Sequence, residues 1–379
     1  MEILLLIAGA GLIYWLQNAL YKKYWAKNLS VSIHFQEKPV LEGEDAHLTE
    51  VIENRKILPL SYLNVKFKIS RYLEFENMEN TSTSDWIYKN DIFSVLFHQR
   101  ITRNLTFHCR KRGYYTINQA DIVSANLLMT NGFVQALPQD THIYVYPRAI
   151  DLGRLDVPFK KMMGSLVSKQ FLYEDPFEFR GLRDYARTDP MSSINWKAWA
   201  KTGELMVNVH DSTSSQEAVV FLNLEDETVW KYDQLHEVAI RIAAALCYRF
   251  LNASIPTRIL CNGMDILTNG AAVLPAGTGL RQVNTINEIL ARIDLTKETI
   301  PCINLVEELK SRPDSSASMP LYVMISNCMR QDLQQSFASL AAHSAGAMWI
   351  APLYDDMELH VEQTPQMDVV RWEVDRYEA

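Results

Sequence analysis

Charged and aromatic side chains are concentrated between Phe177 and Asp211. Basic and acidic residues alternate there with large aromatic ones: Arg180, Arg183, Asp184, Arg187, Asp189, Lys197 and Lys201, with Tyr185, Trp196 and Trp199. Arginine and aspartate at such spacing form bidentate ion pairs, and tryptophan or tyrosine faces stack on guanidinium groups. Two interpretations follow. The segment is either an ion-pair latch that ties an irregular stretch to a sheet, or a docking surface or active site.

Other catalytic chemistry is missing from the sequence. It contains no G-x-x-x-x-G-K-[ST] phosphate loop, no G-x-S-x-G nucleophile elbow and no H-E-x-x-H zinc motif. Its five cysteines fall in no C-x-x-C pair and no zinc spacing. The net charge of −8 argues against nucleic acid as a partner, because nucleic-acid binding needs a basic surface. These observations predict a non-enzymatic protein without a cofactor.

The chain begins with an uncharged apolar run from Ile3 to Leu20, which Lys22 and Lys23 follow. Roughly 20 apolar residues span a bilayer core, and basic residues beside a span stay on the cytoplasmic side. Residues 1–25 are therefore predicted to be a single-pass transmembrane anchor in the lipid bilayer. The protein would lie in the cell membrane with its soluble part in the cytoplasm.

Two domains are predicted beyond this anchor. Short alternating runs separated by turn residues indicate a β-sandwich. Further along, buried strand-like runs such as Ala218 to Leu224 alternate with helical patterns, which is typical of a doubly wound α/β sheet. The predicted boundaries are 29–148 for the sandwich, 149–176 for a linker, 177–361 for the α/β domain with 177–211 as its opening segment, and 362–379 for a polar C-terminal tail.

The opening segment resembles the signature of the domain-of-unknown-function 58 family, E-F-x-G-L-R-D-Y, x-D-P, I-N-W-K-A and L-x-V. The family often has aspartate where this chain has Asn195, and glycine where it has Thr188. The residues that carry the resemblance are Glu178, Phe179, Gly181, Leu182, Arg183, Asp184, Tyr185, Asp189, Pro190, Ile194, Asn195, Trp196, Lys197, Ala198, Leu205 and Val207.

This resemblance implies a von Willebrand factor A-like α/β domain. Such domains hold a divalent ion at the C-terminal ends of the sheet, in a D-x-S-x-S loop and a later Ser-Asp pair. The matching positions are Asn223, Glu225 and Glu227, followed by Ser326 and Asn327, so both aspartates are amides here. Carboxylates still suit Mg²⁺ or Ca²⁺, which take oxygen ligands. The expectation is an altered metal site, or else a solvated acidic loop that caps the following segment.

Members of this family are membrane-anchored and usually encoded beside a MoxR-type AAA+ ATPase. The resemblance therefore implies a protein-interaction adaptor that works with such an ATPase in assembling or remodelling a client. The alternative is a metal-dependent hydrolase or transferase acting on a cell-envelope precursor, with the acidic loop and Arg183 and Asp184 as its site. The sequence shows no nucleophile–base pair, which favours the adaptor.

Overall fold

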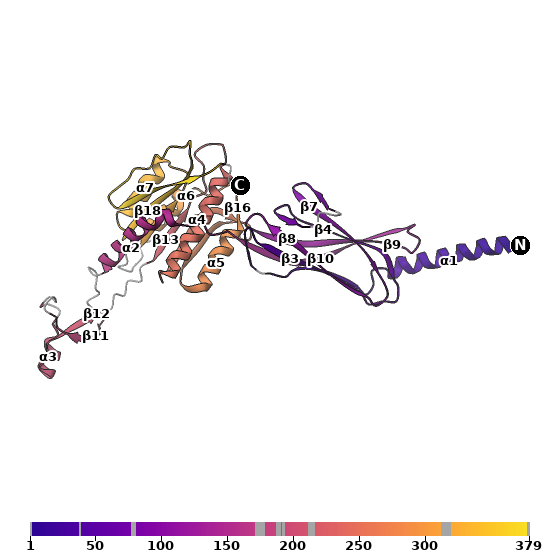
Figure 1. The fold of residues 1–379 in the computed structure, drawn as a ribbon, viewed down its shortest axis with the longest axis horizontal. Helices are drawn as coiled ribbons and strands as arrows, with labels where there is room; N and C mark the ends of the chain where they lie inside the picture. The colour runs from indigo at the N-terminus through magenta and orange to yellow at the C-terminus, as the bar shows by residue number, and fades with distance from the viewer. Residues whose placement is uncertain are drawn as a thin grey trace. The chain divides into compact units, whose positions relative to one another are not determined.

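The computed structural model describes residues 2–37, 39–76, 81–170, 179–186, 191, 194–210, 217–311 and 320–376. The chain divides into two compact units, Met1–Arg148 and Ala149–Ala379 (Figure 1).

The first unit contains the β-sandwich expected for residues 29–148. One sheet has the strand order β1–β3–β8–β5, and the other has the order β2–β10–β9–β4–β7–β6. Burial alternates along most strands, because successive side chains point to opposite faces of a sheet. The strands are β1 (Leu29–Phe35), β2 (Val40–Leu41), β3 (Asp45–Asn54), β4 (Leu60–Ser70), β5 (Leu73–Phe75), β6 (Thr81–Thr83), β7 (Trp86–Val95), β8 (Arg100–Cys109), β9 (Gly113–Ala125) and β10 (Gly132–Tyr146).

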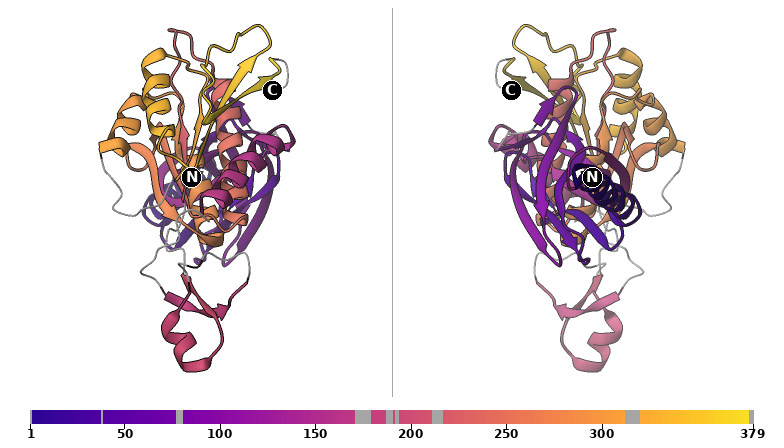
Figure 2. Two further views of the ribbon diagram at one scale, coloured as in Figure 1. Left: turned by 90° about the vertical axis from the view of Figure 1, so that its left-hand side faces the viewer. Right: turned by 90° about the vertical axis from the view of Figure 1, so that its right-hand side faces the viewer.

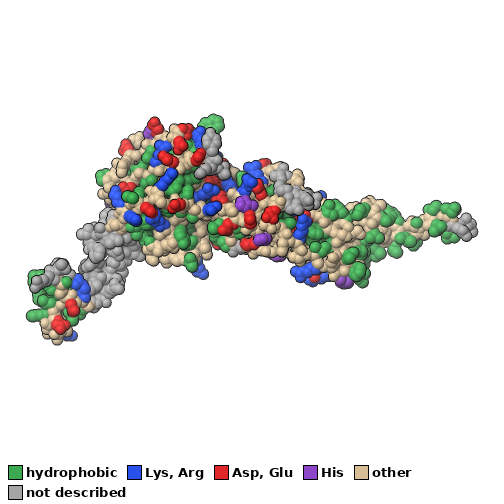
Figure 3. All heavy atoms as spheres, viewed as in Figure 1, with side chains coloured by type: hydrophobic (Ala, Val, Ile, Leu, Met, Phe, Trp, Pro, Cys, Tyr) green, Lys and Arg blue, Asp and Glu red, His purple; other side chains and the backbone are tan. Residues whose placement is uncertain are grey.

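A helix, α1 (Glu2–Tyr24), precedes the sandwich. Apolar side chains are exposed along its N-terminal half (Figure 3). Its C-terminal end packs on the sandwich, where Tyr21 and Trp25 are buried and the Tyr21 hydroxyl donates to the Pro59 carbonyl at 2.7 Å. Among the described residues, no helix combines the length and the apolar character that crossing a membrane requires.

This finding corrects the prediction for residues 1–25. The transmembrane anchor, the single-pass cell-membrane location with a cytoplasmic soluble part, and the fold class that began with a transmembrane helix are wrong. Gln17 and Asn18 interrupt the apolar run, and the Asn18 side chain accepts a hydrogen bond from Asn131 at 2.9 Å. The uninterrupted stretch before Gln17 is shorter than the roughly 20 residues that a span needs.

The sandwich interior contains a cluster of charged side chains. Glu50 on β3, together with Lys89 and Asp91 on β7, is almost completely buried. Arg103 on β8 donates to the Asp91 carboxylate at 2.8 Å, and the Lys89 ammonium lies 3.9 Å from the same oxygen. Burial, and then the neighbouring Asp91 carboxylate, raise the pKa of Glu50 to about 8, although Arg103 and Lys89 act in the opposite direction.

The second unit is built on a mixed sheet with the strand order β15–β14–β13–β17–β18–β19. The strands from β14 to β19 in this order run parallel, and β15 and the short β16 pair with β14 in the antiparallel sense. The elements are η1 (Gly153–Leu155), α2 (Asp156–Gln170), β13 (Ala218–Leu222), α4 (Asp233–Asn252), β14 (Thr257–Asp265), β15 (Ala271–Gly277), α5 (Gly279–Arg292), β16 (Ile293–Asp294), α6 (Cys302–Ser311), β17 (Leu321–Ile325), α7 (Gln331–Ala341), β18 (Gly346–Tyr354) and β19 (Met367–Val374).

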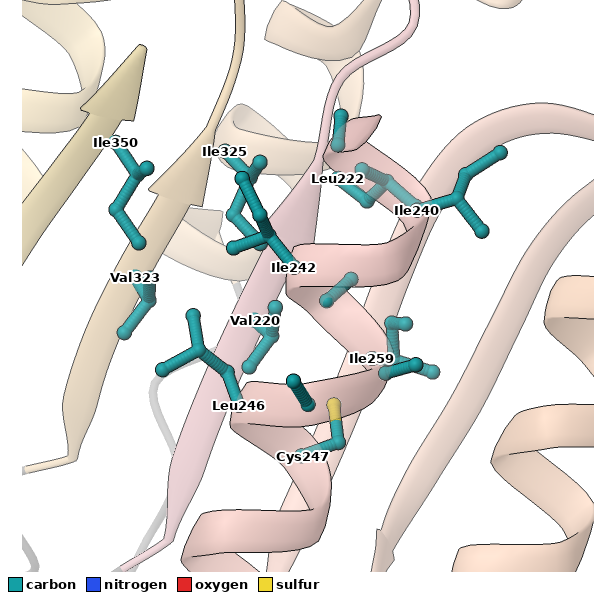
Figure 4. Packing of buried hydrophobic residues seen from close by; sticks show 14 of the residues in the cluster. Val220, Leu222, Ile240, Ile242, Leu246, Cys247, Ile259, Val323, Ile325 and Ile350 are labelled. Carbon is teal, nitrogen blue, oxygen red and sulfur yellow. The ribbon is translucent and has the colours of Figure 1, made fainter. Parts of the chain in front are cut away.

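Helices cover both faces of this sheet. Every residue of β13 is buried, as expected for a central parallel strand. Val220 and Leu222 face the layer that contains α4 (Figure 4), whereas Val219 and Phe221 face the layer that contains α6 and α7. The continuous apolar run of β13 is therefore explained by contact with a helical layer on each side.

Two segments that were expected to lie outside the α/β domain contribute to it. The predicted linker contains α2, which buries Phe159 and Met162 in the core, and the predicted tail contains β19, which pairs with β18 and buries Trp372. The signature segment, which was expected to open the α/β domain, forms β11 (Phe179–Asp184), α3 (Trp196–Thr202) and β12 (Met206–His210). Strands β11 and β12 pair with each other, and α3 lies beside them (Figure 2).

The Glu50 carboxyl predicts an unusual dependence of stability on pH. Its pKa is 4.5 ordinarily and about 8 in the folded protein, so the folded state binds an extra proton between these values. The free energy of unfolding should therefore fall as pH rises through this window. Replacing Glu50 by glutamine should remove this loss and stabilise the protein under alkaline conditions. Urea unfolding at about pH 5 and about pH 9 measures the difference.

Glu53→Gln is the matched control, because Glu53 lies on the same strand and its pKa is lowered by the Arg55 guanidinium. If Glu50→Gln and the wild type lose stability equally between the two pH values, Glu50 is not the group responsible.

Candidate functional site

Two of the predicted site residues meet where adjacent parallel strands end. Asn223 follows β13 and Ser326 follows β17, and the last residues of these strands, Leu222 and Ile325, are paired. The Asn223 side-chain amide donates to the Ser326 hydroxyl oxygen at 3.0 Å, and both residues are fully buried. The Ser326 hydroxyl also donates to the Cys328 carbonyl at 2.8 Å, so its hydrogen-bonding capacity is used within the site.

A third residue, Asn262 on β14, completes a buried amide network. Its side-chain nitrogen donates to Asn223 Oδ1 at 2.7 Å and to the Ile300 carbonyl at 3.0 Å, and its oxygen accepts from the Leu224 backbone N–H at 2.8 Å. Buried polar groups are stable only when they are paired. Here the Asn223 amide links the ends of β13 and β17, and the Asn262 amide links β14 to the end of β13. Asn262 was missed in the sequence, although a polar residue directly after the buried run Thr257 to Cys261 was the available signal.

The acidic residues of the loop after β13 cap the neighbouring segments. Glu225 Oε2 accepts from the backbone N–H of Cys302 at 2.8 Å, at the N-terminus of α6. A carboxylate is favourable at this helix end, because the N–H groups there carry partial positive charge. Arg330 lies 3.8 Å from the other Glu225 oxygen, and Glu227 accepts from the Met329 backbone N–H.

Asp226 forms the most enclosed charged contact of the loop. Its Oδ1 lies 3.1 Å from His236 Nε2 and accepts from the Asn327 amide at 2.8 Å, and its Oδ2 accepts from the Tyr232 backbone N–H at 3.3 Å. Burial alone would raise the pKa of Asp226, but the hydrogen bonds and charge of His236 and the Asn327 amide outweigh it and lower the pKa. This carboxyl is therefore held ionised beside α4.

The structure therefore brings the five residues of the predicted metal site to one sheet edge, but as a hydrogen-bonded cap. The oxygens of Glu225 and Glu227 already accept from backbone N–H groups, and Asn327 donates to Asp226. Across the described ranges, no group of three or more acidic, histidine or cysteine side chains is arranged to hold a metal ion. Of the two expectations for these residues, a bound Mg²⁺ or Ca²⁺ and an acidic loop that caps the following segment, the contacts favour the capping loop.

Buried thiols lie close to this edge. Cys302 begins α6, and Cys328 lies two residues after Ser326. Burial, ahead of the charge of Glu227, raises the pKa of Cys328 to about 11, and burial also raises the pKa of Cys302. A thiol needs to lose its proton to act as a nucleophile or metal ligand, so these two are chemically quiet at neutral pH.

A pocket of about 320 Å³ opens beside Asp226 and His236. It is bordered by the loop after β13, and two residues of that loop are unusually exposed: Val229 is 99% and Trp230 is 77% exposed. Neither was singled out in the sequence, because an apolar pair in a loop gives no periodic signal. These residues are the most prominent apolar feature at this edge of the sheet.

The signature segment has a structure of its own. Gly181, Leu182, Arg183 and Asp184 lie on β11, and Tyr185 follows it. Asn195 caps α3 by accepting from the Ala198 backbone N–H at 2.9 Å, and Trp196 and Lys197 begin the helix. Arg187 and Asp189 lie outside the described residues.

The latch interpretation required buried charges in this segment. Arg183 and Asp184 are exposed, and the Arg183 guanidinium donates to the Asp184 backbone carbonyl at 3.2 Å. Trp196 and Trp199 meet edge to face with ring centroids 6.1 Å apart, and both are about half exposed. The large destabilisation that follows from breaking a buried ion pair is therefore not expected at Arg183.

Comparisons with known proteins add little to this geometry. No family model matches the sequence, and no curated protein matches it. Similar solved structures include a non-cellulosomal cohesin from Archaeoglobus fulgidus, with 11% identity over 34% of this chain and 97% of that chain and a TM-score of 0.21. A CARDB domain from Pyrococcus furiosus shares 11% identity over 30% of this chain and 90% of its own, with a TM-score of 0.19.

The sporulation control protein Spo0M from Bacillus subtilis shares 11% identity over 42% of this chain and 58% of its own, with a TM-score of 0.19. Likenesses of this size carry no functional argument. The resemblance to the domain-of-unknown-function 58 family stays a prediction, and these comparisons lend no support to a von Willebrand factor A domain.

Removing the central amide of the network should destabilise the protein. Asn262→Ala leaves the Leu224 N–H without its partner and takes one donor from the Ile300 carbonyl and one from Asn223 Oδ1, which still accepts from the Glu225 N–H. Each buried group left unpaired costs about 1–3 kcal/mol of unfolding free energy. Urea unfolding should show this loss, whereas Asn284→Ala on the exposed face of α5 should change stability by no more than about 0.5 kcal/mol. Equal stability of the two variants would contradict the importance of the network.

Adding millimolar MgCl₂ or CaCl₂ should leave the melting temperature unchanged at constant ionic strength. A metal that binds only the folded state would raise it. The carboxylates of Glu225 and Glu227 already have donors, which argues against such binding. If the ions raise the melting temperature of the wild type but not that of Glu227→Gln, these residues do bind a metal ion.

Proposed function

We propose that this protein is a non-enzymatic adaptor whose α/β unit binds a partner protein through the loop after β13. The observation that carries the proposal is Trp230, which is 77% exposed beside the fully exposed Val229. Tryptophan is among the residues that most often dominate binding energy at protein interfaces. A large ring left in water on a structured loop costs free energy that burial against a partner would recover.

The loop holds these residues in place before any partner binds. Asp226 accepts from the Tyr232 N–H, which closes the loop around Trp230, and the Trp230 N–H donates to the Thr228 hydroxyl at 3.3 Å. Glu225 fastens the start of the loop to α6. A preorganised loop loses less conformational entropy on binding than a mobile one. The buried amide network and the carboxylate caps thus support an exposed tip.

A MoxR-type AAA+ ATPase is the proposed partner, as the resemblance of the segment 178–207 implies. Glu227 and Asp233 are exposed on either side of Trp230, and Lys231 lies beside it. With the net charge of −8, this surface favours a basic patch on the partner and an association that weakens as salt rises. In this proposal the adaptor supplies recognition, and ATP hydrolysis by the partner drives assembly or remodelling of a client.

The alternative, a metal-dependent hydrolase or transferase, is less well supported. It needs carboxylates that are available to a metal ion or a proton. Glu225, Asp226 and Glu227 instead accept hydrogen bonds from Cys302, Tyr232 and Met329 in turn. The geometry therefore favours the adaptor.

Trp230→Ala should weaken capture of the purified ATPase by roughly tenfold or more without changing the melting temperature. Biolayer interferometry with the full-length protein, in each nucleotide state and at two salt concentrations, measures the effect. Leu280→Ala is the matched control, because Leu280 is 79% exposed at the start of α5. Nearby Gly277 pairs with Thr257, the first residue of β14, whereas Trp230 follows the C-terminal end of β13. Failure of the wild type to bind in any nucleotide state would overturn the proposed partner, and unchanged binding of Trp230→Ala would overturn the proposed surface.

A further inference from the structure

The turn between β3 and β4 contains an ammonium group without a partner. Within the described part of the chain, Lys56 Nζ is buried from solvent and forms no hydrogen bond. Burial lowers the pKa of Lys56 to about 8. A buried charge costs free energy unless an opposite charge or an acceptor compensates for it. A ligand that brings an acceptor to Lys56 would supply the compensation that the described residues do not.

Lys56 lines a pocket of about 370 Å³ where α1 meets the sandwich. This volume lies within the range of small-molecule binding sites. The described residues that line it come from the end of α1, the segment before β1 and the turn before β4, and none of them is acidic: Leu20, Tyr24, Lys27, Asn28, Lys56 and Leu58. The pocket therefore combines apolar side chains with two basic ones.

Further basic residues surround this pocket. The ammonium groups of Lys23 and Lys27 lie 5.4 Å and 5.7 Å from the centre of the Tyr24 ring. Glu53, the acidic residue closest to Lys56 in the sequence, accepts from the Arg55 guanidinium at 2.8 Å. The charge around the pocket is thus positive, and the ligand that matches it is an anion.

Backbone and side-chain hydrogen bonds hold the walls of the pocket in place. The Arg55 backbone N–H donates to the Asn28 carbonyl at 2.9 Å, which joins the turn to the segment before β1. The buried Asn54 side chain donates to the Leu58 carbonyl at 3.0 Å within the turn. A pocket that is formed in advance loses less conformational entropy when a ligand binds.

We propose that this pocket binds a carboxylic acid with a short apolar chain. Lys56 donates to its carboxylate, and Lys27 adds a second positive charge at the same end of the ligand. The chain packs on Leu20 and Leu58, because burial of apolar surface supplies the remaining affinity. One ionised carboxylate matches the single unpaired ammonium, whereas a neutral ligand leaves that charge uncompensated. The pocket belongs to the first unit, so the proposal is independent of the partner surface around Trp230 in the second unit.

Isothermal titration calorimetry of the full-length protein with sodium octanoate at neutral pH should show saturable one-to-one binding. Octanamide, which has the same chain without the charge, should bind at least roughly tenfold more weakly. Lys56→Met removes the ammonium but keeps an unbranched side chain. It should weaken octanoate binding by roughly tenfold or more without lowering the melting temperature, because it strands no opposite charge. Lys66→Met, which removes an exposed lysine of β4 outside the pocket, should bind octanoate like the wild type.

Methyl NMR locates the bound chain in protein labelled at its leucine methyl groups. Octanoate should shift the resonances of Leu20 and Leu58 but not those of Leu5 and Leu12, which are exposed further along α1. Shifts at Leu5 and Leu12 instead would show nonspecific adhesion to the apolar helix and overturn the proposal. Equal binding of octanamide, unchanged octanoate binding by Lys56→Met, or no binding of octanoate by the wild type would overturn it as well.

Discussion

The hydrogen-bonded register of β13 between β14 and β17 is the constraint on which the site at the C-terminal ends of these strands depends. Leu222 is paired with Cys261 on one side and with Ile325 on the other. The residues that follow Leu222, Cys261 and Ile325 are Asn223, Asn262 and Ser326. These three polar residues therefore lie side by side, and all of them are buried. They are tolerated there because they hydrogen-bond to one another and to backbone groups. A shift of one residue would direct them to the wrong faces.

This network also explains the behaviour of the acidic loop that follows. Once Asn223 and Asn262 have fixed the backbone at Leu224 and Glu225, the carboxylates of the loop reach the N–H groups of Cys302 and Tyr232. Residues that would suit a cation thus become structural caps. The same caps hold the loop in the conformation that exposes Trp230, so a core interaction is coupled to a surface proposed to bind a partner.

The sandwich has an interior that contains charged groups and is therefore costly in free energy to form. Glu50 and Asp91 bring two carboxyl groups into a low-dielectric interior, and Arg103 and Lys89 compensate for only part of that cost. These buried charges reduce the stability that a uniform apolar sandwich would have.

Local sequence patterns were sufficient for much of the architecture. Alternating residues identified the sandwich, and continuous apolar runs such as 218–224 identified central strands. The remaining features depended on contacts between segments far apart in the chain. Helix α1 was misread because the apolar run was counted through Gln17 and Asn18, and because the contacts of Asn18 with Asn131 and of Tyr21 with Pro59 cannot be seen in the sequence. Strand β19 was hidden because only pairing with β18 makes its mixed sequence a strand. The partners of Glu50 and Asn262 lie on other strands, so tertiary structure alone decided that one is a buried acid and the other the centre of a network.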